Sequence, residues 1–137
     1  METNTAITQA ESIVRTAASQ VLTPGAAECL VCYVDRLLEQ HGCDNTHRFT
    51  EQYRIASAPR HTALVKRLAR MGACCCDCEI FLNAYRPAWS LWTPERRVEA
   101  SDGFVEFIES SPPAAMPPCA GVPRGSVKPC EHWERIW

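Results

Sequence analysis

The sequence predicts a small all-α domain of about five helices, with a cysteine-rich metal site and an irregular, proline-rich C-terminal tail. Between residues 5 and 85, apolar residues recur every three or four positions, which is typical of amphipathic helices. Six of the ten prolines lie from Pro112 onward, which disfavours a helix there. Four of the nine cysteines fall within residues 74–78, more densely than a hydrophobic core requires. We therefore assign residues 1–110 to a helical metal-binding domain and residues 111–137 to a tail that packs back onto it.

Local signals indicate the limits of the first two helices. One apolar stripe covers residues 5–22. In the second helix, Pro24 suits the first helical position and Gly42 can end the helix as a left-handed cap. Cys29 and Cys32 lie on the flank of its apolar face, three residues apart, so we expect them to be able to share a ligand.

Three further helices are predicted. The third ends near Ser57, and the fourth extends from Pro59 to Gly72. Asp77 is placed to cap a fifth helix over residues 78–85, which would put two cysteines at its start.

Beyond residue 86 the pattern is weaker. Residues 93–95 (Thr-Pro-Glu) resemble another helix start. Residues 104–108 have helical spacing after the Asp102–Gly103 break, with a short strand as the alternative.

The composition is that of an ordinary water-soluble globule. The 137 residues are 46% hydrophobic and 22% charged, and the net charge of -2 gives no general attraction to nucleic acid or membrane. No run approaches the roughly 18 apolar residues of a membrane span, and the N-terminal residues lack the pattern of a signal peptide. We expect a cytoplasmic protein, whose thiols are ligands or reactive groups rather than structural disulfides.

The cysteines indicate one metal site and allow a second. Structural zinc takes four thiolate or imidazole ligands. Cys43, Cys76 and Cys78 supply three ligands for the first site, since a helix start stabilises thiolates. The fourth ligand is left open among these residues: Cys29, Cys32, His47 and Cys75.

The tail offers a second group of donors. Cys119, Cys130 and His132 make three ligands, with Cys74 or Cys75 available as the fourth. Zinc is the favoured ion because cytosolic sites of cysteine and histidine usually hold it. Cu(I) is the first alternative, because it prefers soft ligands, and an iron–sulfur cluster is the second.

Two boxes in the sequence resemble an uncharacterised family of small bacterial proteins. Residues 43–50 fit the pattern CDxTxRxT, and residues 76–83 fit the pattern CDCExxxN. The resemblance extends over roughly residues 42–84 and implies no particular activity. The family usually has a histidine where this chain has Asn45, so that candidate ligand is missing here.

The resemblance also implies a set of supporting polar residues in the two boxes: Asp44, Thr46, Arg48, Thr50, Asp77, Glu79 and Asn83. Among them, Asp44 and Thr46 can cap a helix. Arg48 can pair with Asp77 or Glu79 and so join the two cysteine loops.

Three functions are compatible with these residues. The first is an interaction or regulatory module stabilised by a structural zinc site, with an unidentified macromolecular partner that is expected to be a protein. The second is a Zn²⁺- or Cu(I)-handling or redox-sensing protein that uses surplus thiols. The third is a zinc enzyme with Glu79, Asp44 or His47 as acid or base; thiolate-rich sites are usually the closed, structural kind, which disfavours it.

One helix face is basic and could contact phosphate through Arg60, Lys66, Arg67 and Arg70. A solvated face is the favoured interpretation, because no aromatic platform or groove-reading motif accompanies it. The sequence also has no phosphate-binding glycine loop, serine triad pattern or dinucleotide fingerprint.

Overall fold

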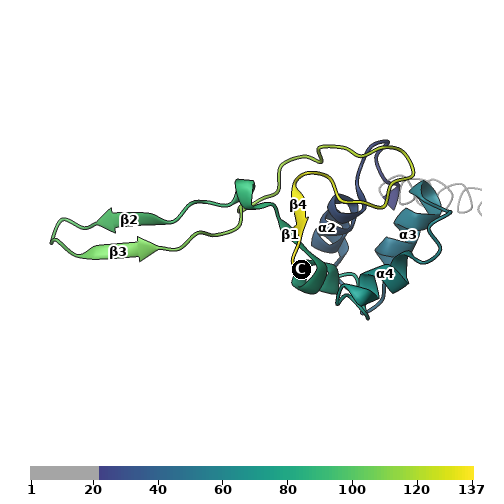
Figure 1. The fold of residues 1–137 in the computed structure, drawn as a ribbon, viewed down its shortest axis with the longest axis horizontal. Coiled ribbons are helices and arrows are strands. Elements are labelled where there is room, and N and C mark those ends of the chain that lie inside the picture. Colours follow the sequence, from purple (N-terminus) through teal and green to yellow (C-terminus); the bar gives the residue numbers. More distant parts are fainter. Residues whose placement is uncertain (1–21) are drawn as a thin grey trace, which may run out of the picture.

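The computed structural model describes residues 22–137, so the helix predicted for residues 5–22 lies almost wholly outside the described part of the chain. The described residues form a helical body, a strand pair packed on it and a long hairpin (Figure 1). In chain order the elements are α2 (Leu30–His41), α3 (Arg48–Ser57), α4 (Leu64–Arg70), the π-helical turn η1 (Ile80–Ala84), β1 (Tyr85–Pro87), the 3-10 turn η2 (Trp89–Leu91), β2 (Arg96–Glu99), β3 (Val105–Ile108) and β4 (Trp133–Arg135).

Helix α2 is the central element of the body. It begins later than Pro24 predicts because Cys29 takes the N-cap position, with an extended backbone and with its Sγ accepting a hydrogen bond from the Cys32 amide at 3.3 Å. The predicted end is confirmed: Gly42 has φ 75°, and its amide donates to the Leu38 carbonyl. The apolar face of α2 forms the middle of the core: Leu30, Val31, Tyr33, Val34 and Leu37.

Helices α3 and α4 cover this face. α3 packs against both α2 and α4, and it buries Phe49 and Tyr53 in the shared core. α4 is shorter than predicted, because residues 58–63 form successive turns before the helix begins at Leu64. The prediction of helices is therefore confirmed for the middle of the chain, with later starts for two of them.

The all-α prediction is wrong beyond residue 84. Strand β1 pairs antiparallel with β4, so that Tyr85 lies opposite Arg135 and Pro87 opposite Trp133. The proline-rich segment between the two sheets runs back across the helical body before it enters β4 (Figure 1). Val127 of this segment and Trp133 of β4 are buried in the main core, which attaches the C-terminal part of the chain to the helices.

A second pair of strands replaces the helix predicted from residues 93–95. β2 and β3 form an antiparallel hairpin that projects from the body (Figure 1). Its turn contains Gly103 at φ 85°, and the Phe104 amide donates to the Asp102 carboxylate at 2.9 Å. An Asp-Gly turn between alternating residues is a strong hairpin signal, so the short-strand alternative was the better interpretation of residues 104–108.

The fifth predicted helix is reduced to one π-helical turn. Tyr85 leaves the helical conformation to pair with β4, so η1 contains only Ile80–Ala84. None of the helices in residues 22–137 is long and apolar enough to cross a membrane.

Candidate metal centres

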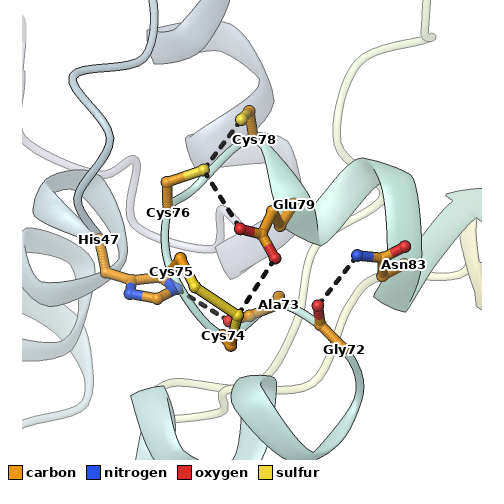
Figure 2. Close-up of a disulfide and its surroundings, with 9 residues drawn as sticks. All are labelled: His47, Gly72, Ala73, Cys74, Cys75, Cys76, Cys78, Glu79 and Asn83. Carbon is orange, nitrogen blue, oxygen red and sulfur yellow. Dashed lines mark hydrogen bonds between the residues drawn. A yellow bond between two sulfur atoms is a disulfide. The ribbon is translucent and has the colours of Figure 1, made fainter.

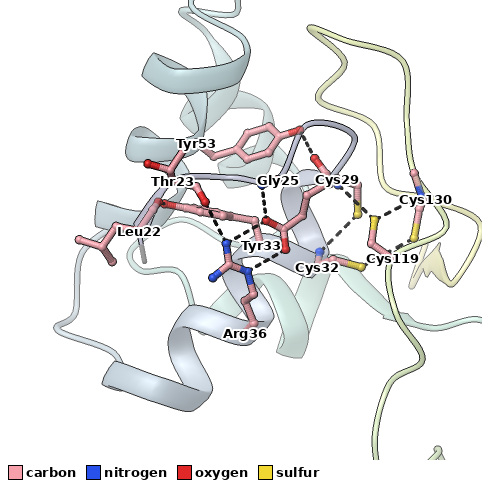
Figure 3. Close-up of polar contacts among 12 residues, drawn as sticks. Leu22, Thr23, Gly25, Cys29, Cys32, Tyr33, Arg36, Tyr53, Cys119 and Cys130 are labelled. Atoms are coloured by element: carbon pink, nitrogen blue, oxygen red, sulfur yellow. Dashed lines mark hydrogen bonds and ion pairs between the residues drawn. The ribbon is translucent and has the colours of Figure 1, made fainter. Parts of the chain in front are cut away.

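Four cysteines from distant parts of the chain lie together; we call Cys29, Cys32, Cys119 and Cys130 the four-cysteine cluster (Figure 3). Their sulfur atoms are all within 4.8 Å of one another. A zinc ion with Zn–S distances of about 2.3 Å requires sulfur separations of about 3.8 Å in a tetrahedron. The Cys32 and Cys130 sulfurs are 3.8 Å apart. The cluster therefore has the size of a site for one ion.

Backbone amides at the start of α2 and in the tail point at these sulfurs. The Cys29 amide donates to Cys119 Sγ at 3.3 Å, and the Gly121 amide donates to the same sulfur at 3.4 Å. Gly121 has φ 91°, a conformation that favours glycine. The Val122 amide then donates to the Ala27 carbonyl at 2.9 Å. Such donors orient the sulfur that they contact, as outer-shell partners of metal sites do.

Aromatic side chains hold the tail against the cluster. Trp133 Nε1 donates to Cys32 Sγ at 3.2 Å, and its ring packs edge-on against Phe81. The Tyr53 hydroxyl lies within hydrogen-bonding distance of the carbonyls of Glu28 and Ser126, at 2.9 and 3.2 Å. The cluster is thus built at the contact between α2 and the tail, and Cys29 and Cys130 are buried there.

The pKa values of three thiols in the cluster, Cys29, Cys32 and Cys130, are shifted. A hydrogen bond from the Cys32 thiol lowers the pKa of Cys29 to about 5, although burial opposes this effect. The same hydrogen bond, with burial, raises the pKa of Cys32, and burial raises the pKa of Cys130. One thiolate is therefore stabilised by neighbouring thiols, and a bound cation has to displace their protons.

A second set of thiols, the three-cysteine group, consists of Cys43, Cys76 and Cys78. Their sulfurs also lie within 4.8 Å of one another, and those of Cys76 and Cys78 are 3.0 Å apart (Figure 2). Cys76 is buried, Cys78 is half-buried and Cys43 is exposed. This group includes one exposed thiol, whereas the four-cysteine cluster has two buried and two half-buried thiols.

Asp77 fixes the loop between Cys76 and Cys78. Its buried carboxylate accepts from the amides of Phe49 and Thr50, at 2.9 and 3.2 Å, and from the Thr50 hydroxyl at 2.6 Å. These amides belong to the first turn of α3 and have no carbonyl partner within the helix. A negative charge is favourable at this end of a helix. Asp77 thus caps α3 and not the predicted fifth helix.

Hydrogen bonds also shift the pKa values of Cys43 and Cys78. Burial raises the pKa of Cys43, but donation from the Asn45 amide and from Cys78 outweighs it and leaves this pKa below its usual value. The pKa of Cys78 rises to about 12 through its hydrogen bonds with Cys76 and then Cys43.

The thiols are grouped differently from the sequence expectation. Cys29 and Cys32 join the tail cysteines instead of serving Cys43, because α2 starts at Leu30 and presents both thiols to the tail. Cys74 and Cys75 complete neither set, since they are joined by a disulfide (Figure 2). A Cys29-x-x-Cys32 pair at a helix start could have indicated a metal site of its own. The helix start predicted at Pro24 placed both cysteines in the middle of a helix instead, so this pattern was not recognised.

The predicted histidine ligands have other positions. His47 Nε2 donates to the Ala73 carbonyl at 3.0 Å (Figure 2), and His47 lies at the N-cap of α3. His132 Nδ1 is buried and has no hydrogen-bond partner among the described residues. Neither imidazole is among the donors that lie within 4.8 Å of the cysteines in either set.

The polar residues of the two boxes mainly shape the loops. Asp44 accepts from the amide and hydroxyl of Thr46, and Arg48 reaches Asp44 at 3.5 Å instead of the expected Asp77 or Glu79. Arg48 cannot serve Asp77, because the amides of α3 already surround that carboxylate.

Asn83 secures the turn before the disulfide. Its amide Nδ2 donates to the Gly72 carbonyl at 2.9 Å (Figure 2). Glu79 lies between the thiol groups, with Oε1 3.9 Å from Cys76 Sγ and Oε2 3.6 Å from Cys74 Sγ. A disulfide sulfur carries no hydrogen, so the approach of Cys74 is a contact and not a hydrogen bond.

Residues 30–83 match the family model described as "Protein of unknown function (DUF2695)", which confirms the resemblance to an uncharacterised family. No curated protein and no solved structure matches the chain. The matched segment contains the whole three-cysteine group but only Cys32 of the four-cysteine cluster.

Proposed function

We propose that the four-cysteine cluster holds one structural zinc ion; the family model that matches residues 30–83 has no known function, so the site itself carries the assignment. The observation that carries the proposal is the mutual approach of four sulfurs within 4.8 Å. Four thiolates complete the tetrahedral shell of zinc and leave no position for a substrate, which is the arrangement of structural sites.

The ligand geometry favours zinc over the two alternatives. An iron–sulfur cluster inserts iron and sulfide between its cysteines, so its four thiolates lie further apart than those of a single ion. Cu(I) accepts thiolates, but a closed set of four matches the coordination number of zinc better. The closed set also supports a structural role in preference to catalysis.

The proposed role of the whole protein is that of an interaction or regulatory module. The ion would fasten the tail to α2 and leave other surfaces for a partner, which we expect to be a protein. The hairpin exposes Phe104 and Phe107, whose side chains are 67% and 65% exposed. The basic residues Arg60, Lys66, Arg67 and Arg70 are exposed as well, so nucleic acid remains the alternative partner.

Metal analysis of purified protein tests the structural site. We expect one zinc ion to survive dialysis against a weak chelator in the wild type and in Cys43→Ser, and to be lost in Cys130→Ser. Cys43→Ser is the matched control, because it removes an exposed thiol of the other group. Stoichiometric zinc in Cys130→Ser, or a metal-free wild type with the same thermal stability, contradicts the proposal.

A further inference from the structure

The three-cysteine group has chemistry that a structural ion at the other cluster does not use. We propose that Cys43, Cys76 and Cys78 form a second site, which binds a thiophilic closed-shell ion, Zn²⁺ or Cu(I), and exchanges it with thiol ligands from outside the chain. This proposal does not rest on the proposed function, since the two sets share no residue.

The two loops that carry these thiols are held together without any metal. Besides capping α3 through its side chain, Asp77 donates its backbone amide to the Thr46 carbonyl at 3.0 Å. This bond joins the loop of Cys76 and Cys78 to the loop that follows Cys43. Asn45 turns the second loop at φ 68°, and its amide donates to Cys43 Sγ at 3.4 Å. The thiols are therefore brought together by the fold, which lowers the entropic cost of binding an ion.

The site offers three thiolates and an open side. Within the described residues, no fourth donor lies within 4.8 Å of all three sulfurs. His47 is hydrogen-bonded to the Ala73 carbonyl. The Glu79 carboxylate lies 3.9 Å from Cys76 Sγ but is not within 4.8 Å of all three sulfurs. A metal site with three protein ligands keeps a position for an external ligand.

Exposure of Cys43 makes ligand exchange accessible. An incoming thiolate can enter the open position before the protein thiolates leave, and Cys43 is the exposed ligand that can depart first. No electrons are transferred: the acceptor thiols lose protons as they bind the ion, and the released cysteines take up protons. In the four-cysteine cluster no thiol is exposed: Cys29 and Cys130 are buried, and Cys32 and Cys119 are half-buried.

The experiment counts ions and times their release. The parent protein carries Cys74→Ser and Cys75→Ser, because reductant would otherwise free these two thiols beside Glu79. Metal-free protein is titrated anaerobically with Zn²⁺, and separately with Cu(I), against a coloured chelator. We expect two ions per chain, of which one passes rapidly to the chelator and the other slowly. The two titrations give the affinity of the fast site for each ion.

Two variants assign the fast ion. Cys43→Ser and Cys78→Ser should each weaken its binding by at least about a hundredfold and leave the slow ion in place, since loss of a direct ligand should cost more than the roughly 10–100-fold that follows loss of an outer-shell partner. Circular dichroism checks that both variants remain folded. The proposal is overturned if the parent releases no ion rapidly, or if the fast ion survives both substitutions. Loss of the slow ion alone would contradict the structural zinc site and not this one.

Discussion

Asp77 links the chemistry of the thiol loop to the stability of the helical body. Its carboxylate lies 28 residues from the Phe49 amide along the chain, and its side chain is 1% exposed. A buried carboxylate is costly unless hydrogen bonds compensate its charge, and here the first turn of α3 supplies them. The residue therefore positions Cys76 and Cys78 on its two sides while it completes a helix that contains no cysteine.

Asp77→Asn should lower the free energy of unfolding by about 1–3 kcal/mol. The amide replaces one acceptor oxygen with an NH₂ group, which then faces the donors of α3. Urea denaturation of metal-free protein measures the change. Asp44→Asn is the control, because Asp44 is exposed, caps its own turn and pairs only with the exposed Arg48. Equal losses in the two variants would contradict the role assigned to the buried carboxylate.

Gly72→Ala should destabilise the protein more than Gly103→Ala. Both glycines have positive φ, 102° and 85°, so each substitution carries a similar backbone strain. An added Cβ at Gly72 lies 2.8 Å from the Asn83 Cβ, whereas nothing lies within 4 Å at Gly103. We expect an additional loss of about 1 kcal/mol at Gly72 from the clash, measured by thermal unfolding. A larger loss at Gly103 would contradict this close approach.

At the scale of elements, local signals predicted the helices and long-range contacts decided the rest. Gly42 ends α2 as expected, because a glycine cap acts within its own turn. The Asp102–Gly103 pair is likewise a local turn signal, although the apolar residues that follow it, in residues 104–108, were interpreted as having helical spacing. By contrast, the pairing of Tyr85 with Arg135 depends on residues 50 positions away, which no local pattern specifies.

For the candidate site as well, the sequence predicted the local grouping of cysteines better than the long-range one. The association of Cys43 with Cys76 and Cys78 was expected from the two boxes, and the structure brings these three sulfurs within 4.8 Å. The partners of Cys29 and Cys32 were not identified, because they depend on where the tail crosses α2. Sequence proximity also suggested a ligand role for Cys74 and Cys75, which lie beside Glu79, outside both thiol sets, and are joined by a disulfide; this role stays a prediction.

The β2–β3 hairpin should be dispensable for folding. All four side chains of β2 are exposed, and its backbone pairs with β3 alone among the described strands. Replacing residues 95–109 with a short glycine–serine linker should change the free energy of unfolding by no more than about 1 kcal/mol. Chemical denaturation measures this change, and metal analysis should give the same zinc content. Loss of cooperative unfolding would show instead that the hairpin supports the body.

For the molecule as a whole, the four-cysteine cluster closes a loop of the chain. The Cys29 amide and the Cys119 sulfur that it contacts are 90 residues apart in sequence. An ion bound to the folded form alone stabilises that form by mass action. In the proposed metal-bound state, the ion therefore joins the helices and the tail into one cooperative unit.

Chelation of the proposed zinc ion should expose the tail to protease. We expect trypsin to cleave after Arg124, which is exposed in the tail, several-fold faster once the ion is removed. Arg97 in β2 is an internal reference, because its exposure in the hairpin is independent of the cluster. Mass spectrometry of the fragments measures both rates. Equal acceleration at both sites would indicate general unfolding rather than release of the tail.

The separation of the cluster's two halves also has a consequence for synthesis on the ribosome. Cys29 is translated 90 residues before Cys119, an interval of about 5–20 seconds at ordinary elongation rates. During this interval the nascent chain already presents two thiols of the cluster, but neither of their partners exists. The three-cysteine group, by contrast, is complete once Cys78 has been made. Its thiols are therefore available to a cellular metal pool first, and the structural ion can be enclosed only after Cys130 has been added.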